Sequence, residues 1–281
     1  MRSSNPVFSR SEGFNGRGSG NAYGNQTYPG NGMTYPAYGS GSTSGQGGAP
    51  STVDQGRMTL DSVVQKTGIS LGVVVLVAAA TWILTGDLTE ESIGPLYMLG
   101  LVGALAGFAL SMVNSFKKVV SPPLVLAFAV AEGVFVGAFS KALEGTVGDG
   151  LVIGAVLGTV AAVAGTLAAY KFFDIQVSSR FRKWVVAAMF GFVAVSLFDF
   201  VLSFFGASVG VNEFGRLGLI MSVVGLAIGV LMLILDFDFV ERGIAAGLPE
   251  VESWRAAFGL TVTIVWIYIE ILRILAILRG D

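Results

Sequence analysis

The sequence contains no cysteine and no histidine in its 281 residues. Their absence excludes disulfides, metal sites built from thiolates or imidazoles, and nucleophile systems built on a Ser–His or Cys–His pair. Charged residues are also scarce, at 13%, whereas about a quarter is usual in soluble proteins. Carboxylates are therefore the groups left to carry chemistry in this chain.

A net charge of −2 offers no basic surface for nucleic acid, and no glycine-rich loop precedes a Lys-Ser or Lys-Thr pair that could bind phosphate. We therefore expect no nucleic-acid partner. Apolar residues make up 53% of the chain, and the mean hydropathy is +0.72. So much apolar surface cannot be buried in one soluble core, so the sequence predicts a membrane protein whose immediate partner is the lipid bilayer.

Seven apolar segments follow one another, each near the roughly 20 residues that span a bilayer as a helix. We expect spans at residues 68–84, 94–113, 122–139, 150–172, 184–205, 215–240 and 257–278. The fold class is thus all-α, a bundle of seven transmembrane helices over residues 58–281. Glycines at four-residue spacing predict close helix contacts at Gly150, Gly154 and Gly158, and at Gly225 and Gly229.

Residues 1–57 differ abruptly in composition, because Gly, Ser, Asn and Tyr dominate them. Such a segment cannot bury enough apolar surface to offset its ordering entropy, so we expect a disordered tail. A short amphipathic stretch then leads into the first span, with Thr59 or Asp61 as its helix cap.

Basic residues near the ends of the spans predict the orientation, because Lys and Arg are retained on the cytoplasmic side. A cytoplasmic N-terminus puts ten of them inside: Arg57, Lys66, Lys117, Lys118, Lys171, Arg180, Arg182, Lys183, Arg242 and Arg255. Only Lys141, Arg216 and Arg279 then lie outside. We expect a cytoplasmic N-terminus and, after seven spans, an external C-terminus.

Acidic residues inside the spans are the candidate functional residues, because a charge at membrane depth is costly. There are five: Glu132, Asp199, Asp236, Asp238 and Glu270. Each also has a purely structural interpretation. Glu132 could hydrogen-bond a neighbouring helix, and Asp199 offers no clear indication of either kind.

The last two spans carry the remaining acids. Asp238 precedes Arg242 by four residues and Glu270 precedes Arg273 by three, so each could form a local ion pair. Asp236 has no cation at helical spacing and needs a partner from another helix, for which Glu270 is the natural candidate at comparable depth.

Two carboxylates that meet in a medium of low dielectric cannot both stay ionised alone. They either share a proton or hold a divalent cation between them. Oxygen ligands suit Ca²⁺, so Asp236 and Glu270 are a candidate site at which H⁺ and Ca²⁺ compete. No other cofactor is expected.

Several motifs resemble the Bax inhibitor 1 family (transmembrane Bax inhibitor motif proteins), and within it the bacterial Bax-inhibitor-1-like branch. They are Ser4-Asn5-Pro6-Val7-Phe8, Ser121-Pro122, Glu132-Gly133, Leu235-Asp236-Phe237-Asp238-Phe239-Val240-Glu241, Glu252-Ser253-Trp254-Arg255 and Ile267-Tyr268-Ile269-Glu270-Ile271-Leu272-Arg273. The resemblance implies seven helices with one at the centre, in a bacterial inner membrane. It also implies a pH-sensitive Ca²⁺ leak channel, gated by a carboxylate pair from the last two helices.

Asp236 matches the family's sixth-helix acid best, with Asp238 as a competitor, and Glu270 matches the seventh-helix acid. The family more often has Asp at the latter position, and its loop between these helices is shorter. A basic latch on the second helix is described for the family, but residues 94–113 contain no Arg. Lys117, Lys118 or Arg273 would have to replace it.

The resulting hypothesis is a pH-modulated, Ca²⁺-permeable leak channel rather than an enzyme. A membrane stress regulator that binds a protease or another partner is the main alternative, and a proton-coupled transporter would use the same acids. An intramembrane aspartyl protease is disfavoured. Its Gly-x-Gly-Asp element has no match at the right spacing, because the nearest sequence, residues 145–149, reads Gly-Thr-Val-Gly-Asp.

Overall fold

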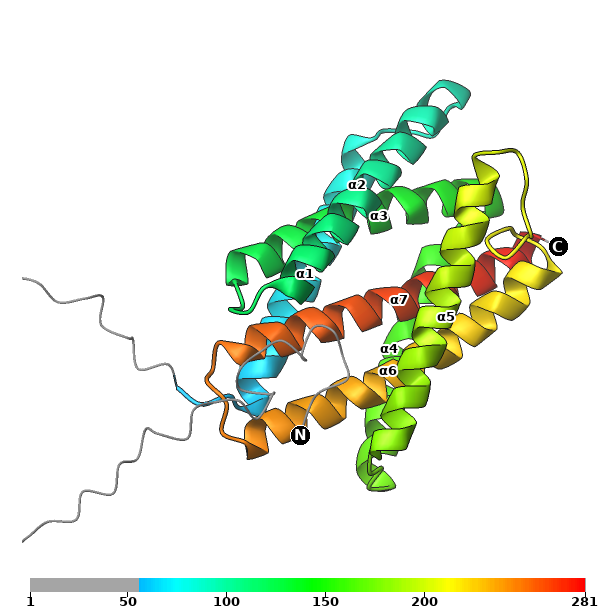
Figure 1. Cartoon of the computed structure of the whole chain (residues 1–281). Coiled ribbons are helices and arrows are strands. Elements are labelled where there is room, and N and C mark those ends of the chain that lie inside the picture. Colours follow the sequence, from blue (N-terminus) through cyan, green and yellow to red (C-terminus); the bar gives the residue numbers. More distant parts are fainter. Residues whose placement is uncertain (1–55, 281) are drawn as a thin grey trace, which may run out of the picture.

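The computed structural model describes residues 56–280, which form seven helices joined by short connections (Figure 1). The helices are α1 (Leu60–Leu84), α2 (Glu90–Phe116), α3 (Pro122–Val147), α4 (Leu151–Phe172), α5 (Ser179–Ser203), α6 (Arg216–Ala245) and α7 (Glu252–Gly280). All seven are long and apolar enough to cross a membrane. The predicted all-α bundle of seven spans is confirmed.

Most helices extend beyond the predicted spans, because polar residues at their ends continue the helical turns. Thr59 caps α1, exchanging hydrogen bonds with Ser62, so the amphipathic stretch and the first span form one helix. The helix α3 continues to Val147 instead of ending at residue 139. Lys141 and Glu144, expected in an outer loop, therefore lie on the last turns of this helix.

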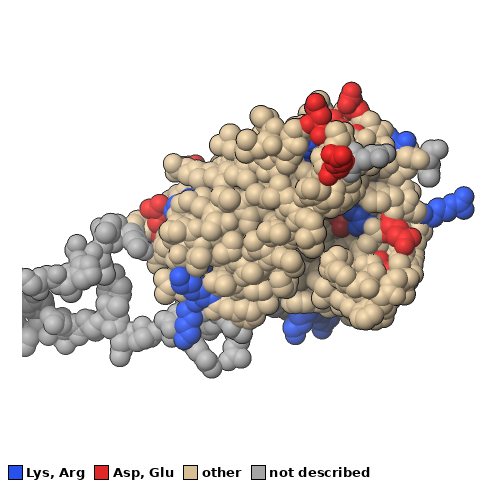
Figure 2. All heavy atoms as spheres, turned by 90° about the horizontal axis from the view of Figure 1, so that it is seen from above, with Lys and Arg blue, Asp and Glu red and all other residues tan. Residues whose placement is uncertain are grey.

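The helix α7 is the central element of the bundle, as Figure 1 shows for this orange to red segment. It packs against α1, α3, α4 and α6, whereas α2 packs mainly on α3 and α5 mainly on α6. Many apolar side chains on the outer helices stay exposed, and Figure 2 shows a broad uncharged surface with charged side chains gathered around its margins. Such a surface is suited to contact with acyl chains.

Glycines permit the close contacts between helices. Gly154 and Gly158 of α4 face Leu275 and Ile271 of α7, so the predicted contact is confirmed at these two positions. Gly150 has a different role, because it precedes α4 with a positive φ of 83°. A further close approach was not predicted: a methyl group at Gly137 of α3 would lie 2.6 Å from the carbonyl oxygen of Ala78 on α1.

The predicted disordered tail falls outside the described residues except for Gly56 and Arg57. These two residues lie along the connection between α6 and α7, where the Glu250 N–H donates to the Gly56 carbonyl and the Met58 N–H donates to the Leu248 carbonyl. Met58 is buried in the core beneath this contact. We call this end of the bundle the tail side, and the end with the α1–α2 connection the far side.

Candidate functional site

The α6–α7 hairpin carries most of the candidate acids. The two helices run antiparallel from a short connection, and Gly225 and Gly229 of α6 lie directly against α7. A methyl group at Gly229 would be 2.9 Å from the side chain of Ile267, so the predicted close contact of these glycines is confirmed. The close approach leaves little room for water beside the acidic side chains.

Asp236 lies on the tail-side half of this interface and is 3% exposed. Its Oδ2 accepts a hydrogen bond of 2.6 Å from the hydroxyl of Thr263 on α7. None of the ion pairs within residues 56–280 includes Asp236. Its polar partner on the seventh helix is therefore Thr263, and not Glu270.

Glu270 lies further toward the far side and is 5% exposed. Its carboxylate packs against Gly225, where a methyl group would lie 2.6 Å from Oε1. The Oε2 atom is 3.7 Å from Nη1 of Arg273, which makes an ion pair but not a hydrogen bond. This oxygen and the buried hydroxyl of Ser222 have no hydrogen-bond partner within the described residues.

The structure thus does not bring Asp236 and Glu270 together. Thr263 and Glu270 are seven residues apart on α7, which is two helical turns or about 10 Å along the axis. The two carboxylates occupy successive levels of one interface, and the comparable depth expected for them is not observed. Their roles as pH sensor and gate stay predictions.

Asp238 has a different environment, at the tail-side end of α6. It accepts a hydrogen bond of 2.8 Å from Arg182 of α5 and pairs with Arg242 at 2.9 Å. The local pair with Arg242 was expected from the spacing, whereas Arg182 was not. The two arginines neutralise the charge of the Asp238 carboxylate, and the pair with Arg182 links α5 to α6. These contacts explain the residue by structure alone.

Asp199 and Glu132 lie away from the α6–α7 interface. Asp199, on the last turns of α5, accepts hydrogen bonds from the backbone N–H groups of Val209, Gly210 and Asn212, and so anchors the α5–α6 connection. Glu132 of α3 packs against Gly107 of α2 and lines a cavity of about 180 Å³.

The three candidates for a basic latch differ in their distance from the candidate acids. Arg273 contacts Glu270 and also donates a hydrogen bond of 3.1 Å to the Val211 carbonyl, so it ties the acid to the α5–α6 connection. Lys117 and Lys118 follow α2 on the tail side and are exposed. Among these candidates, Arg273 is the one beside a candidate acid.

The arrangement can hold protons or pass a cation between carboxylates, but it does not form a closed metal centre. Within residues 56–280, no three acidic side chains lie close enough to share one ion. The expected joint Ca²⁺ site of Asp236 and Glu270 is not formed, because the two carboxylates lie on successive levels of the α6–α7 interface. Each carboxylate would meet a cation by itself.

The fold and these buried acids define a multi-pass membrane protein with ionisable groups inside its helical bundle. A family model described as "Bax inhibitor 1 like" matches residues 5–280. The chain belongs to this family, and the suspected resemblance is confirmed. No curated protein matches the sequence.

Proposed function

We propose that this protein is a pH-modulated, Ca²⁺-permeable leak channel of the bacterial inner membrane, rather than an enzyme. In this proposal α6 and α7 separate at their closely packed interface to let the cation pass, and Asp236 and Glu270 are two successive sites at which H⁺ and Ca²⁺ compete. Separate sites suit conduction, because an ion must bind well enough to enter and weakly enough to leave.

The observation that carries the proposal is the incomplete coordination of Glu270. One of its oxygens is buried without a hydrogen bond, 3.7 Å from Arg273. A buried carboxylate left in this state costs free energy, and such residues in membrane spans commonly belong to ion or proton pathways. Asp238 and Asp199, whose oxygens are fully engaged, provide the contrast within the same protein.

The proposal also predicts the direction of the pH response. A carboxylate attracts Ca²⁺ only after it has lost its proton, so protonation at low pH removes the charge that favours the cation. Ca²⁺ flux should therefore rise as the pH rises. Replacing either acid by its amide removes this dependence.

The ten-to-three excess of basic residues supports a cytoplasmic tail side and an external far side. Under this orientation Asp236 is nearer the cytoplasm and Glu270 nearer the outside. The external margin carries several acids, among them Asp87, Glu144 and Asp149, which would concentrate cations modestly.

Flux of Ca²⁺ into liposomes that contain the purified protein tests the proposal. The wild type should give a flux above that of empty liposomes, and Asp236→Asn should change its dependence on pH. Glu91→Gln is the matched control, because it removes an exposed charge at the start of α2. Equal pH profiles for wild type and Asp236→Asn would exclude this acid as a sensor.

A second candidate function is that of a membrane stress regulator whose tail binds a protease or another protein. It is favoured by the contact of residues 56–58 with the α6–α7 connection, which joins the tail directly to the helices that carry Asp236 and Glu270. Coupled H⁺ movement against Ca²⁺ in the liposome assay would instead indicate a proton-coupled transporter.

A further inference from the structure

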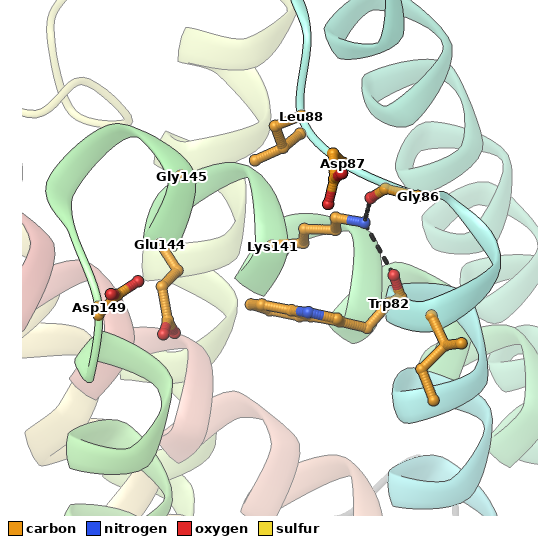
Figure 3. Close-up of a pocket in the computed structure, with 9 residues that line it drawn as sticks. Trp82, Gly86, Asp87, Leu88, Lys141, Glu144, Gly145 and Asp149 are labelled. Carbon is orange, nitrogen blue, oxygen red and sulfur yellow. Dashed lines mark hydrogen bonds between the residues drawn. The ribbon is translucent and has the colours of Figure 1, made fainter.

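Two adjoining cavities lie at the far side of the bundle, away from the α6–α7 interface. An apolar groove of about 550 Å³ runs between α1 and α4, over α3 and α7. A polar pocket of about 360 Å³ lies next to it, beneath the α1–α2 connection (Figure 3). Trp82, Ile83 and Glu144 line both, so the two cavities form one continuous site with an apolar and a polar part.

The groove opens sideways toward the surface that faces the acyl chains. Several apolar side chains on its rim are exposed, including Val75, Ile83, Ile153 and Val160. Its volume is within the roughly 300–1,000 Å³ typical of small-molecule sites. Trp82 marks the polar end, and tryptophan is enriched at the level of lipid headgroups.

The polar pocket has one buried cation, Lys141, which is 5% exposed. Its ammonium donates to the Trp82 carbonyl at 2.8 Å and to the Gly86 carbonyl (Figure 3). It also donates to the Thr85 hydroxyl at 2.7 Å. These three acceptors use all three N–H bonds of the ammonium group. Lys141 therefore has no donor left for an anionic ligand.

Acidic groups outnumber this lysine in the pocket, because Asp87, Glu144 and Asp149 also line it. The two oxygens of Glu144 accept the N–H groups of Gly150 and Val152, which fixes the carboxylate and leaves each oxygen able to accept again. In the described chain, three acids never lie close enough to hold one metal ion. A headgroup with several N–H donors can reach acids that are further apart.

We propose that this site binds a phospholipid with a primary ammonium headgroup, such as phosphatidylethanolamine. One acyl chain occupies the apolar groove, and the ammonium donates hydrogen bonds to Glu144 and Asp149 in the polar pocket. The choice of lipid follows from charge, since three carboxylates line the polar pocket and its one lysine has all its donors engaged. The nearby Arg279 is exposed and donates a hydrogen bond of 3.3 Å to the backbone carbonyl of Asp149, so the carboxylate of Asp149 is not its acceptor. Lipid binding at this site does not depend on ion flux along the α6–α7 interface.

Native mass spectrometry of the full-length protein in detergent tests this assignment. Phosphatidylethanolamine, phosphatidylcholine and phosphatidylglycerol with identical acyl chains are added, and the lipid retained per protein is counted. We expect ethanolamine lipid to be retained at about tenfold lower concentration than the glycerol lipid, the change that one charge-assisted hydrogen bond gives. The choline lipid, whose ammonium is charged but has no N–H, should be retained less well than the ethanolamine lipid and better than the anionic glycerol lipid.

Variants separate the two parts of the site. Glu144→Gln combined with Asp149→Asn should remove the preference for the ethanolamine lipid, whereas Glu91→Gln should keep it. Ala79→Phe fills the groove and should weaken retention of all three lipids. Ala80→Phe is its control, because this neighbour is exposed but does not line the groove.

Equal retention of the three lipids by the wild type would overturn the proposal. So would equal behaviour of Ala79→Phe and Ala80→Phe, which would show that lipid binds the outer surface without entering the groove. A preference that survives the loss of both acids would contradict the assignment of the ammonium to the polar pocket.

Discussion

Gly225→Ala should displace the Glu270 carboxylate and destabilise the α6–α7 interface. The added methyl group would lie 2.6 Å from Oε1 of Glu270 and 2.7 Å from the ring of Phe192. Ordinary contact between such atoms begins near 3.4 Å, so the neighbours must move by about 0.8 Å. Overpacking of this kind typically costs about 1–3 kcal/mol, and the Glu270 side chain is the movable group.

Thermal unfolding in detergent measures this cost. A change of 1 kcal/mol shifts Tm by about 2–4 °C in a chain of this size, so a cost of about 1–3 kcal/mol should lower Tm by roughly 2–12 °C. Gly165→Ala is the control, because nothing lies within 4 Å of a methyl group there. It should leave Tm unchanged or raise it slightly, since Ala favours the helix by up to about 1 kcal/mol.

A double variant tests the assignment of the clash to Glu270. In a Glu270→Ala background the carboxylate is absent. Gly225→Ala should then lower Tm by less than half of the decrease that it causes in the wild type. The remaining cost comes from Phe192. Equal Tm values for Gly225→Ala and Gly165→Ala would contradict the close contact between the Glu270 carboxylate and Gly225 of α6.

Three further predictions concern the other acids and the topology. Asp238→Asn should lower stability by about 1–3 kcal/mol in chemical unfolding, because Arg182 loses its anionic partner, yet leave the pH dependence of flux intact. Asp199→Ala should accelerate hydrogen exchange of the Val209 and Asn212 amides by about tenfold while the helices stay protected. Reporter fusions should place the N-terminus in the cytoplasm and the C-terminus outside; a cytoplasmic C-terminus would contradict the orientation.

The seven spans could be predicted because each is a long apolar segment, and the bilayer requires such lengths. The helix ends could not, since polar residues that indicate a loop also find partners within a helix. Lys141 is an example: its donors reach carbonyls at the end of α1, which no local pattern in α3 indicates. Lys141 was therefore expected in a loop but lies within α3.

The acids themselves were visible in the sequence, but their partners depended on the helix register. Residues at equal distance from the α6–α7 connection face each other in an antiparallel hairpin. Asp236 lies 12 residues before Leu248 and Thr263 lies 15 residues after it, a difference of less than one helical turn, whereas Glu270 lies 22 residues after it. Counting from this connection would have placed Asp236 opposite the turn of α7 that includes Leu260 and Thr263, and Glu270 beside Gly225.

The pH dependence of Ca²⁺ conduction is tested by flux into liposomes at about pH 6 and about pH 8. The wild type is compared with a double variant that combines Asp236→Asn with Glu270→Gln. We expect wild-type flux to be larger at the higher pH, and the double variant to have the same flux at both pH values. Wild-type flux no greater than that of empty liposomes, or a double variant that keeps the full pH response, would contradict the proposed function.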